Sequence, residues 1–113
     1  MSVKREIYDG VGVVGVEGEL ADEAAAEARE AVRDHLERRQ VRDVVLDLTH
    51  CTAVASAGLE ALLWAKLRCE EYGGRLKLAG CDEFLLKVLE MTRLRHRFEC
   101  GDTLESALKS MRV

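Results

Sequence analysis

A short apolar run, Val44 to Leu48, lies between two segments whose apolar residues recur with helical spacing, 22–39 and 56–72. A brief β-branched run of this kind is typical of a strand that is covered on both faces. A helix on each side of it means that consecutive strands are joined by crossovers, and such crossovers connect parallel strands. The sequence therefore predicts an α/β domain with a mainly parallel sheet.

The first twenty residues predict one antiparallel pair. The segments Val3–Tyr8 and Val11–Leu20 flank Asp9-Gly10, a dipeptide that tolerates the positive φ of a tight turn, so we expect an N-terminal β-hairpin. The other expected elements are strands at 75–79 and 97–100 and helices at 83–91 and 103–111. The order gives about five strands and four helices. With no proline and no Ser/Gly-rich linker, residues 1–113 are expected to form a single domain.

Charge and hydropathy exclude several classes of protein. The 17 Lys and Arg against 21 Asp and Glu leave a net charge of −4, which disfavours a general nucleic-acid binder. No uncharged apolar run approaches the roughly 20 residues of a membrane-spanning helix, and residues 1–9 do not resemble a signal peptide. The four cysteines form no C-x-x-C pair. We therefore expect a cytoplasmic protein with free thiols and no direct membrane insertion.

Two patterns suggest chemistry but lack its usual context. The glycines of 10–15 match G-x-G-x-x-G, yet they run from a hairpin turn into a strand, so no helix N-terminus is available for a phosphate. Residues at the ends of three expected strands suggest a zinc site or a Cys/His nucleophile: His50, Cys51, Cys81, Asp82 and Cys100. The paired spacing of structural zinc ligands is missing. We therefore expect no metal, no cofactor and no catalytic residue.

Ser56 lies where a loop gives way to a helix. A serine in this position commonly accepts a hydrogen bond from a first-turn amide, as an N-cap, and Asp22 is expected to cap the preceding helix in the same way. The free N–H groups and the positive dipole of a helix start would also favour a phosphoserine. Composition and spacing alone do not separate the two roles.

Trp64 is the only tryptophan of the chain. Its neighbours around the helix are Glu60, Arg68 and Glu71, so it projects from the charged side. An exposed tryptophan of this kind can anchor a protein partner. Alternatively, a neighbouring helix or loop covers the indole.

Four motifs in order resemble the STAS domain (sulfate transporter and anti-sigma factor antagonist). Val44 to Leu48, a loop of about seven residues, and then Ala55-Ser56-Ala57-Gly58-Leu59 resemble the core motif of this family. Gly18-Glu19-Leu20 resembles its G-E-L-D. Gly73-Gly74-Arg75-Leu76 is similar to its G-G-x-L, and 89–94 to its L-x-x-x-G-L. Together the motifs span essentially the whole chain, so a STAS-like fold is expected.

The resemblance implies a function. In the bacterial anti-sigma factor antagonists, a serine at the start of the second helix is phosphorylated by a kinase that is itself the anti-sigma factor, and phosphorylation breaks their complex. On this resemblance Ser56 is the phosphoacceptor, and the protein partner is an anti-sigma factor. The implied partner-binding residues are Ala21, Asp22, Ala55, Ala57, Gly58, Glu60 and Trp64.

The chain departs from the family pattern in the core motif. Ala55 and Ala57 replace the acid and the second hydroxyl of D-S-S-G or D-S-T-G, and Ala21 replaces the acid of G-E-L-D. Either the domain binds constitutively, or Ser56 is modified by a kinase with different requirements. An alternative function with the same fold is a STAS subunit of a lipid-transporting ABC system, which binds the ATPase without phosphorylation. An enzyme that uses the Cys/His cluster is the third hypothesis.

Overall fold

The computed structural model describes residues 2–111. The strands are β1 (Ser2–Tyr8), β2 (Val11–Leu20), β3 (Val44–Asp47), β4 (Cys51–Val54), β5 (Leu76–Ala79) and β6 (Glu99–Gly101). The α-helices are α1 (Asp22–Arg33), α2 (Ser56–Glu71), α3 (Glu83–Met91) and α4 (Leu104–Met111). A π-helical turn, η1 (Asp34–Arg38), follows α1, and a 3₁₀ turn, η2 (Arg95–Arg97), follows α3.

The sheet has the strand order β1-β2-β3-β5-β6, with β4 paired to β2 outside this path. Only β1 and β2 are antiparallel, and every other pair runs parallel. Asp9 and Gly10 form the hairpin turn with φ of 51° and 79°, the left-handed conformation that the dipeptide tolerates. The predicted α/β architecture with a mainly parallel sheet and an N-terminal hairpin is thus confirmed.

Strand β4 is a correction to the sequence analysis, which placed a loop between Leu48 and Ser56. The sheet therefore has six strands rather than about five. The reason is the length of β2, whose residues Gly12–Gly15 pair with β3 and whose last residues remain free to pair. Cys51–Val54 pairs with Gly18–Leu20, with a shift of register after Gly18. A short run of small residues became a strand because a partner strand was already extended beside it.

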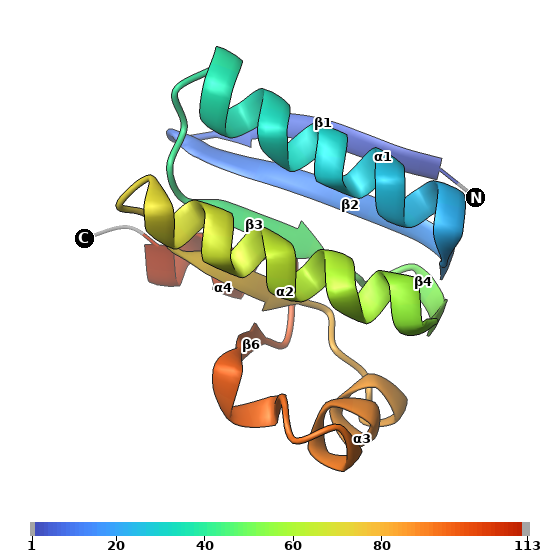
Figure 1. Ribbon diagram of the computed structural model, residues 1–113. Coiled ribbons are helices and arrows are strands. Elements are labelled where there is room, and N and C mark those ends of the chain that lie inside the picture. The colour runs from blue at the N-terminus through green and yellow to red at the C-terminus, as the bar shows by residue number, and fades with distance from the viewer. Residues whose placement is uncertain (1, 112–113) are drawn as a thin grey trace.

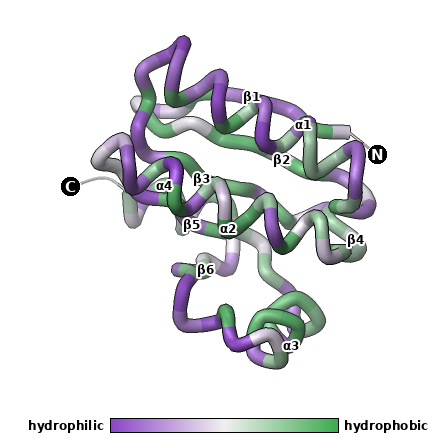
Figure 2. The backbone as a smooth tube through the Cα atoms, viewed as in Figure 1, coloured by the Kyte–Doolittle hydropathy of each residue, from purple (hydrophilic) through white to green (hydrophobic). Residues whose placement is uncertain are grey.

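Helices cover both faces of the sheet, as Figure 1 shows. Helices α1 and α2 lie side by side on one face, and α4 packs on the other. The larger core lies under α1 and α2 and includes Leu20, Leu46, Leu62 and Leu78, all nearly inaccessible. A smaller core under α4 contains Val11, Val45, Ala79, Ala107 and Met111. In Figure 2 the central strands are hydrophobic, whereas the outer side of α1 is largely hydrophilic. No helix among residues 2–111 is long and apolar enough to cross a membrane.

Two expected boundaries differ from the structure by more than one residue. The helix expected over 22–39 is α-helical only to Arg33, after which the Arg39 amide donates to the Asp34 carbonyl at 3.1 Å, the i,i+5 pattern of a π turn. The strand expected at 97–100 begins only at Glu99, because η2 occupies the preceding residues. In the π turn, the Asp34 carboxylate pairs with the Arg38 guanidinium at 3.2 Å.

The π turn places a histidine in the core. His35 is 2% exposed, and its ring stacks over Gly12, where a Cβ would lie 2.8 Å from the imidazole. Its Nε2 lies 3.3 Å from the Val13 carbonyl, and its Nδ1 has no partner among residues 2–111. Burial lowers the pKa of His35, against the opposing effects of the Val13 carbonyl and the adjacent Asp34 carboxylate, and Arg39 and Arg5 lower it further.

The start of α2 packs directly on the backbone of β2. Gly58, in the first turn of the helix, is buried against Leu20, and a Cβ added to it would lie 2.3 Å from the Leu20 carbonyl oxygen. The rest of the buried face of α2 is also made of small side chains with one leucine: Ala61, Leu62, Ala65 and Cys69. Small residues on this face allow the helix to lie close to the sheet.

Gly58→Ala should therefore destabilise the fold by about 1–3 kcal/mol, the usual cost of overpacking a core site. Helix propensity alone predicts the opposite sign, a gain of up to about 1 kcal/mol. The matched control is Gly15→Ala, because a Cβ at Gly15 meets no atom within 4 Å. Urea unfolding of both variants measures the change in the unfolding free energy. If the two variants were equally stable, the close approach of Gly58 to the Leu20 carbonyl would be contradicted.

The buried imidazole should make the protein sensitive to mild acid. An unfolded histidine binds a proton near pH 6.5, whereas folded His35 binds one only at lower pH. Its contribution to stability is complete above pH 6.5 and is lost as the pH falls below that value, by at most about 1.4 kcal/mol per pH unit. His35→Leu should flatten the dependence of the unfolding free energy on pH between 7 and 5. His96→Gln, which replaces an exposed histidine, is the control. If the unfolding free energy of His35→Leu depended on pH as steeply as that of the wild type, the acid sensitivity would not come from His35.

Candidate functional site

Helices α1 and α2 begin next to each other at one end of the sheet (Figure 1). Strand β2 ends at Leu20 and β4 ends at Val54, and these two residues are partners in the parallel pair. The Ala55 amide donates a hydrogen bond to the Leu20 carbonyl at 3.0 Å. Both strands leave the sheet at this point. The residues on either side of the two helix starts therefore lie together. We call this surface, formed by 21–23 and 55–60, the paired helix start.

Ser56 is the first residue of α2, and it is exposed. The N-cap is Ala55, with extended φ and ψ of −88° and 175°, and no side chain caps the helix. The interpretation of Ser56 as the N-cap is thus wrong, because the helix begins one residue earlier than a serine cap would require. The Ser56 hydroxyl has no hydrogen-bond partner among residues 2–111 and is free to react.

Helix α1 repeats this arrangement. Its N-cap is Ala21 and not the expected Asp22, which is the first helical residue and makes no capping hydrogen bond. The other two α-helices are capped in the usual way. Asp82 accepts a hydrogen bond from the Leu85 amide at 2.8 Å, and Thr103 and Ser106 exchange reciprocal bonds at the start of α4. Only the two helices that begin at the paired helix start have alanine caps, among the α-helices that the structure describes.

The charges of the paired helix start are unequally divided. The first turn of α1 carries Asp22 and Glu23, whereas the first turn of α2 has no acid. Glu60 is exposed one turn further along α2. No side chain caps α2, so the positive end of its dipole lies beside the exposed Ser56 hydroxyl.

Trp64 lies between the two helices rather than on the outside of α2. It is half-buried and packs on the core. The Arg33 guanidinium of α1 lies 5.1 Å from the ring centroid and that of Arg68 lies 5.9 Å away, and Arg68 also pairs with Glu37 at 3.5 Å. Helix α1 thus covers part of the indole while Trp64 stays partly accessible, so its role in binding a partner stays a prediction.

The other partner-binding residues expected at the start of α2 differ in their exposure to solvent. Ala55 and Ala57 are half-buried at the start of α2, within reach of a partner at the paired helix start. Gly58 is buried and positions the helix on β2 instead of presenting a surface.

One cleft beside the site was not expected from the sequence. A cleft lies between β4 and the start of α3, lined by Thr52–Val54 together with Asp82, Phe84 and Leu85. Phe84 is 59% exposed, and Met91 at the end of the same helix is 77% exposed. The signal was available in the sequence, since Phe84 and Met91 lie off the face that Leu85 and Leu89 bury.

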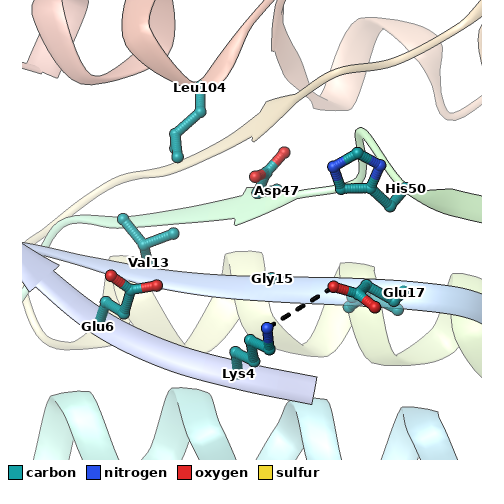
Figure 3. Close-up of a pocket in the computed structure, with 9 residues that line it drawn as sticks. Lys4, Glu6, Val13, Gly15, Glu17, Asp47, His50 and Leu104 are labelled. Carbon is teal, nitrogen blue, oxygen red and sulfur yellow. Dashed lines mark ion pairs between the residues drawn. The ribbon is translucent and has the colours of Figure 1, made fainter. Parts of the chain in front are cut away.

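The residues of the hypothetical Cys/His cluster do not all meet. His50 lines a cavity on the sheet with Lys4, Glu6, Glu17 and Asp47 (Figure 3), and no cysteine contributes to it. The Cys51 thiol donates to the Ala53 carbonyl at 3.3 Å. The side chains of Cys81 and Cys100 do interact, and both pack against the larger core. Residues 2–111 contain no group of His, Cys, Asp and Glu side chains that would hold a metal ion.

Comparison with known proteins agrees with this geometry. The chain is 24% identical to the anti-sigma F factor antagonist of Paenibacillus polymyxa, over its full length and 97% of that protein. An anti-sigma factor antagonist from Mycobacterium paratuberculosis has a similar structure, with a TM-score of 0.84, 24% identity, and coverage of 99% of this chain and 94% of the other. The Bacillus cell fate determinant SpoIIAA in its phosphorylated form gives a TM-score of 0.79 at 20% identity, covering 98% and 100%.

The family model of the STAS domain matches residues 2–107 of this protein, nearly the whole chain. This match, together with the sheet order and the paired helix start, shows that the chain belongs to the STAS domain family.

Proposed function

We propose that this protein is a cytoplasmic, non-enzymatic anti-sigma factor antagonist, which binds an anti-sigma factor through the paired helix start. The observation that carries the proposal is the position of Ser56, exposed and unbonded at the first residue of α2, beside the start of α1. The full-length similarity to a protein named as an anti-sigma F factor antagonist supports it.

Ser56 is the proposed phosphoacceptor. A phosphate there would carry between −1.5 and −2 charges near pH 7, at a helix end whose amides are unbonded and whose first turn has no acid. The helix would stabilise the phosphorylated state of the free protein, whereas a partner packed on the same surface would have to desolvate the dianion. Phosphorylation would thus favour the free protein over the complex.

The missing acids are the feature in which this site departs from the family pattern. Ala21 and Ala55 occupy the N-cap positions of α1 and α2, where the STAS motifs commonly carry aspartate. An aspartate at position 55 would bond the first-turn amides and repel a phosphate on the next residue. Alanine leaves these amides available, at the cost of the capping hydrogen bonds.

Ser56→Glu should weaken the complex with the anti-sigma factor of the same organism about tenfold or more, because a charge enters the interface. Ser56→Ala should bind like the wild type. Gln40→Glu adds the same charge after η1, at the far end of α1 from the site, and should have no effect. Isothermal titration calorimetry measures the three dissociation constants. Glutamate at the first helical position should itself raise stability by about 0.3–1 kcal/mol, so that weaker binding is not caused by unfolding.

Equal affinities for Ser56→Glu and the wild type would argue against the switch at Ser56. Absence of binding by the wild type would argue against the function itself. A pull-down from the native host addresses the alternative function, since recovery of the ATPase of a lipid-transporting ABC system in place of an anti-sigma factor would favour a transport subunit.

Restoring the two caps should stabilise the protein. Ala21→Asp and Ala55→Asp should each raise the free energy of unfolding by about 0.5–2 kcal/mol, because an N-cap aspartate accepts a bond from a first-turn amide. Ala26→Asp is the control, an exposed site inside α1 where aspartate lowers helix propensity. Thermal unfolding reports all three, and a loss of stability in both cap variants would contradict the assigned helix starts.

A further inference from the structure

Cys81 and Cys100 come from neighbouring parts of the sheet. In the parallel pair of β5 and β6, Leu78 is the partner of Cys100. Beyond β5 the Gly80 amide donates to the Gly101 carbonyl at 3.1 Å. Gly80 has a φ of 71°, a left-handed conformation that turns the chain at the end of the strand. The side chain of the next residue, Cys81, interacts with that of Cys100, and both pack against the larger core.

The four thiols differ in reactivity. The hydrogen bond from Cys81 lowers the pKa of Cys100 to about 7, helped by the charge of Arg95 and opposed by burial. The same bond and burial raise the pKa of Cys81. Burial also raises the pKa of Cys51, and it raises that of the inaccessible Cys69 to about 12. Near neutral pH, Cys100 is therefore the thiol with the largest thiolate fraction, and it is partly exposed.

We propose that Cys81 and Cys100 form a reversible intramolecular disulfide when the protein meets a low-molecular-weight disulfide such as oxidised glutathione. Both thiols are only partly buried, so the reagent has access to them. The two side chains interact and both pack against the larger core, so the thiols lie on the same face of the sheet.

The reaction proceeds in two exchanges. The Cys100 thiolate attacks one sulfur of oxidised glutathione, forming a mixed disulfide and releasing one glutathione thiolate. Cys81 then gives its proton to solvent and attacks the Cys100 sulfur, which releases the second glutathione thiolate. The two cysteines together lose two electrons, and the glutathione disulfide gains them. The new bond links the loop after β5 to β6 and encloses α3 and η2 in a covalent loop.

Oxidised glutathione, followed by alkylation and tryptic digestion without reductant, tests the proposal on the full chain. Trypsin cuts after Lys77, Lys87, Arg97 and Lys109, so Cys81 and Cys100 lie in separate peptides, 78–87 and 98–109. The expected product is these two peptides joined, with Cys51 and Cys69 alkylated. Dithiothreitol should restore four free thiols.

Single variants test the order of the exchanges. Cys81→Ser should retain one glutathionyl group on Cys100, because the resolving thiol is absent. Cys100→Ser should remain largely unmodified at Cys81. Cys51→Ser is the matched control, since it removes another partly buried thiol, and it should still form the joined peptides. Recovery of Cys81 and Cys100 as separate alkylated peptides in the wild type, or a link from either one to Cys51, would overturn the proposal.

Discussion

The backbone of β2 is the constraint on which the remaining structure depends. Along one edge its residues Val11–Glu17 pair with β1, and along the other Gly12–Gly15 pair with β3 and Gly18–Leu20 with β4. The carbonyl oxygen of the final residue, Leu20, accepts a hydrogen bond from the Ala55 amide and lies against Gly58. One carbonyl therefore determines where β4 ends and how closely α2 can approach. The two helices start together because both follow from the same end of this strand.

The paired helix start combines a rigid base with an unsatisfied surface. At the far end of α1, the buried His35 fills the space above Gly12, while Arg5, Arg38 and Arg39 pair with Asp34. Between the helices, Trp64 lies against two guanidinium groups. These contacts hold α1 and α2 along their length and leave their first turns without caps. A surface of free amides on fixed helices is suited to respond to a negative charge, because the donors are oriented before the charge arrives.

Local patterns in the sequence were sufficient for most of the fold. Asp9-Gly10 supplies its own turn conformation, and the apolar spacing of α2 is a property of 56–72 alone. The run at Val44 is apolar on both faces, which indicates burial without knowledge of its neighbours. The place of Ser56 at a helix start, and hence the candidate phosphosite, could be predicted in the same way, since a change from loop to helix is encoded within a few residues.

Features that need contact between distant residues were decided only by the tertiary structure. Cys51–Val54 has no strand pattern of its own and becomes β4 because the end of β2 offers free hydrogen-bonding groups. Trp64 is covered because α1 lies against α2, although its own helix places it on a charged side. Cys81 and Cys100 meet through the pairing of β5 with β6. The sequence by itself thus determined which segments are helices and strands and that a serine begins α2. The packing decided which side chains meet, because a contact depends on the positions of two segments whereas periodicity describes only one.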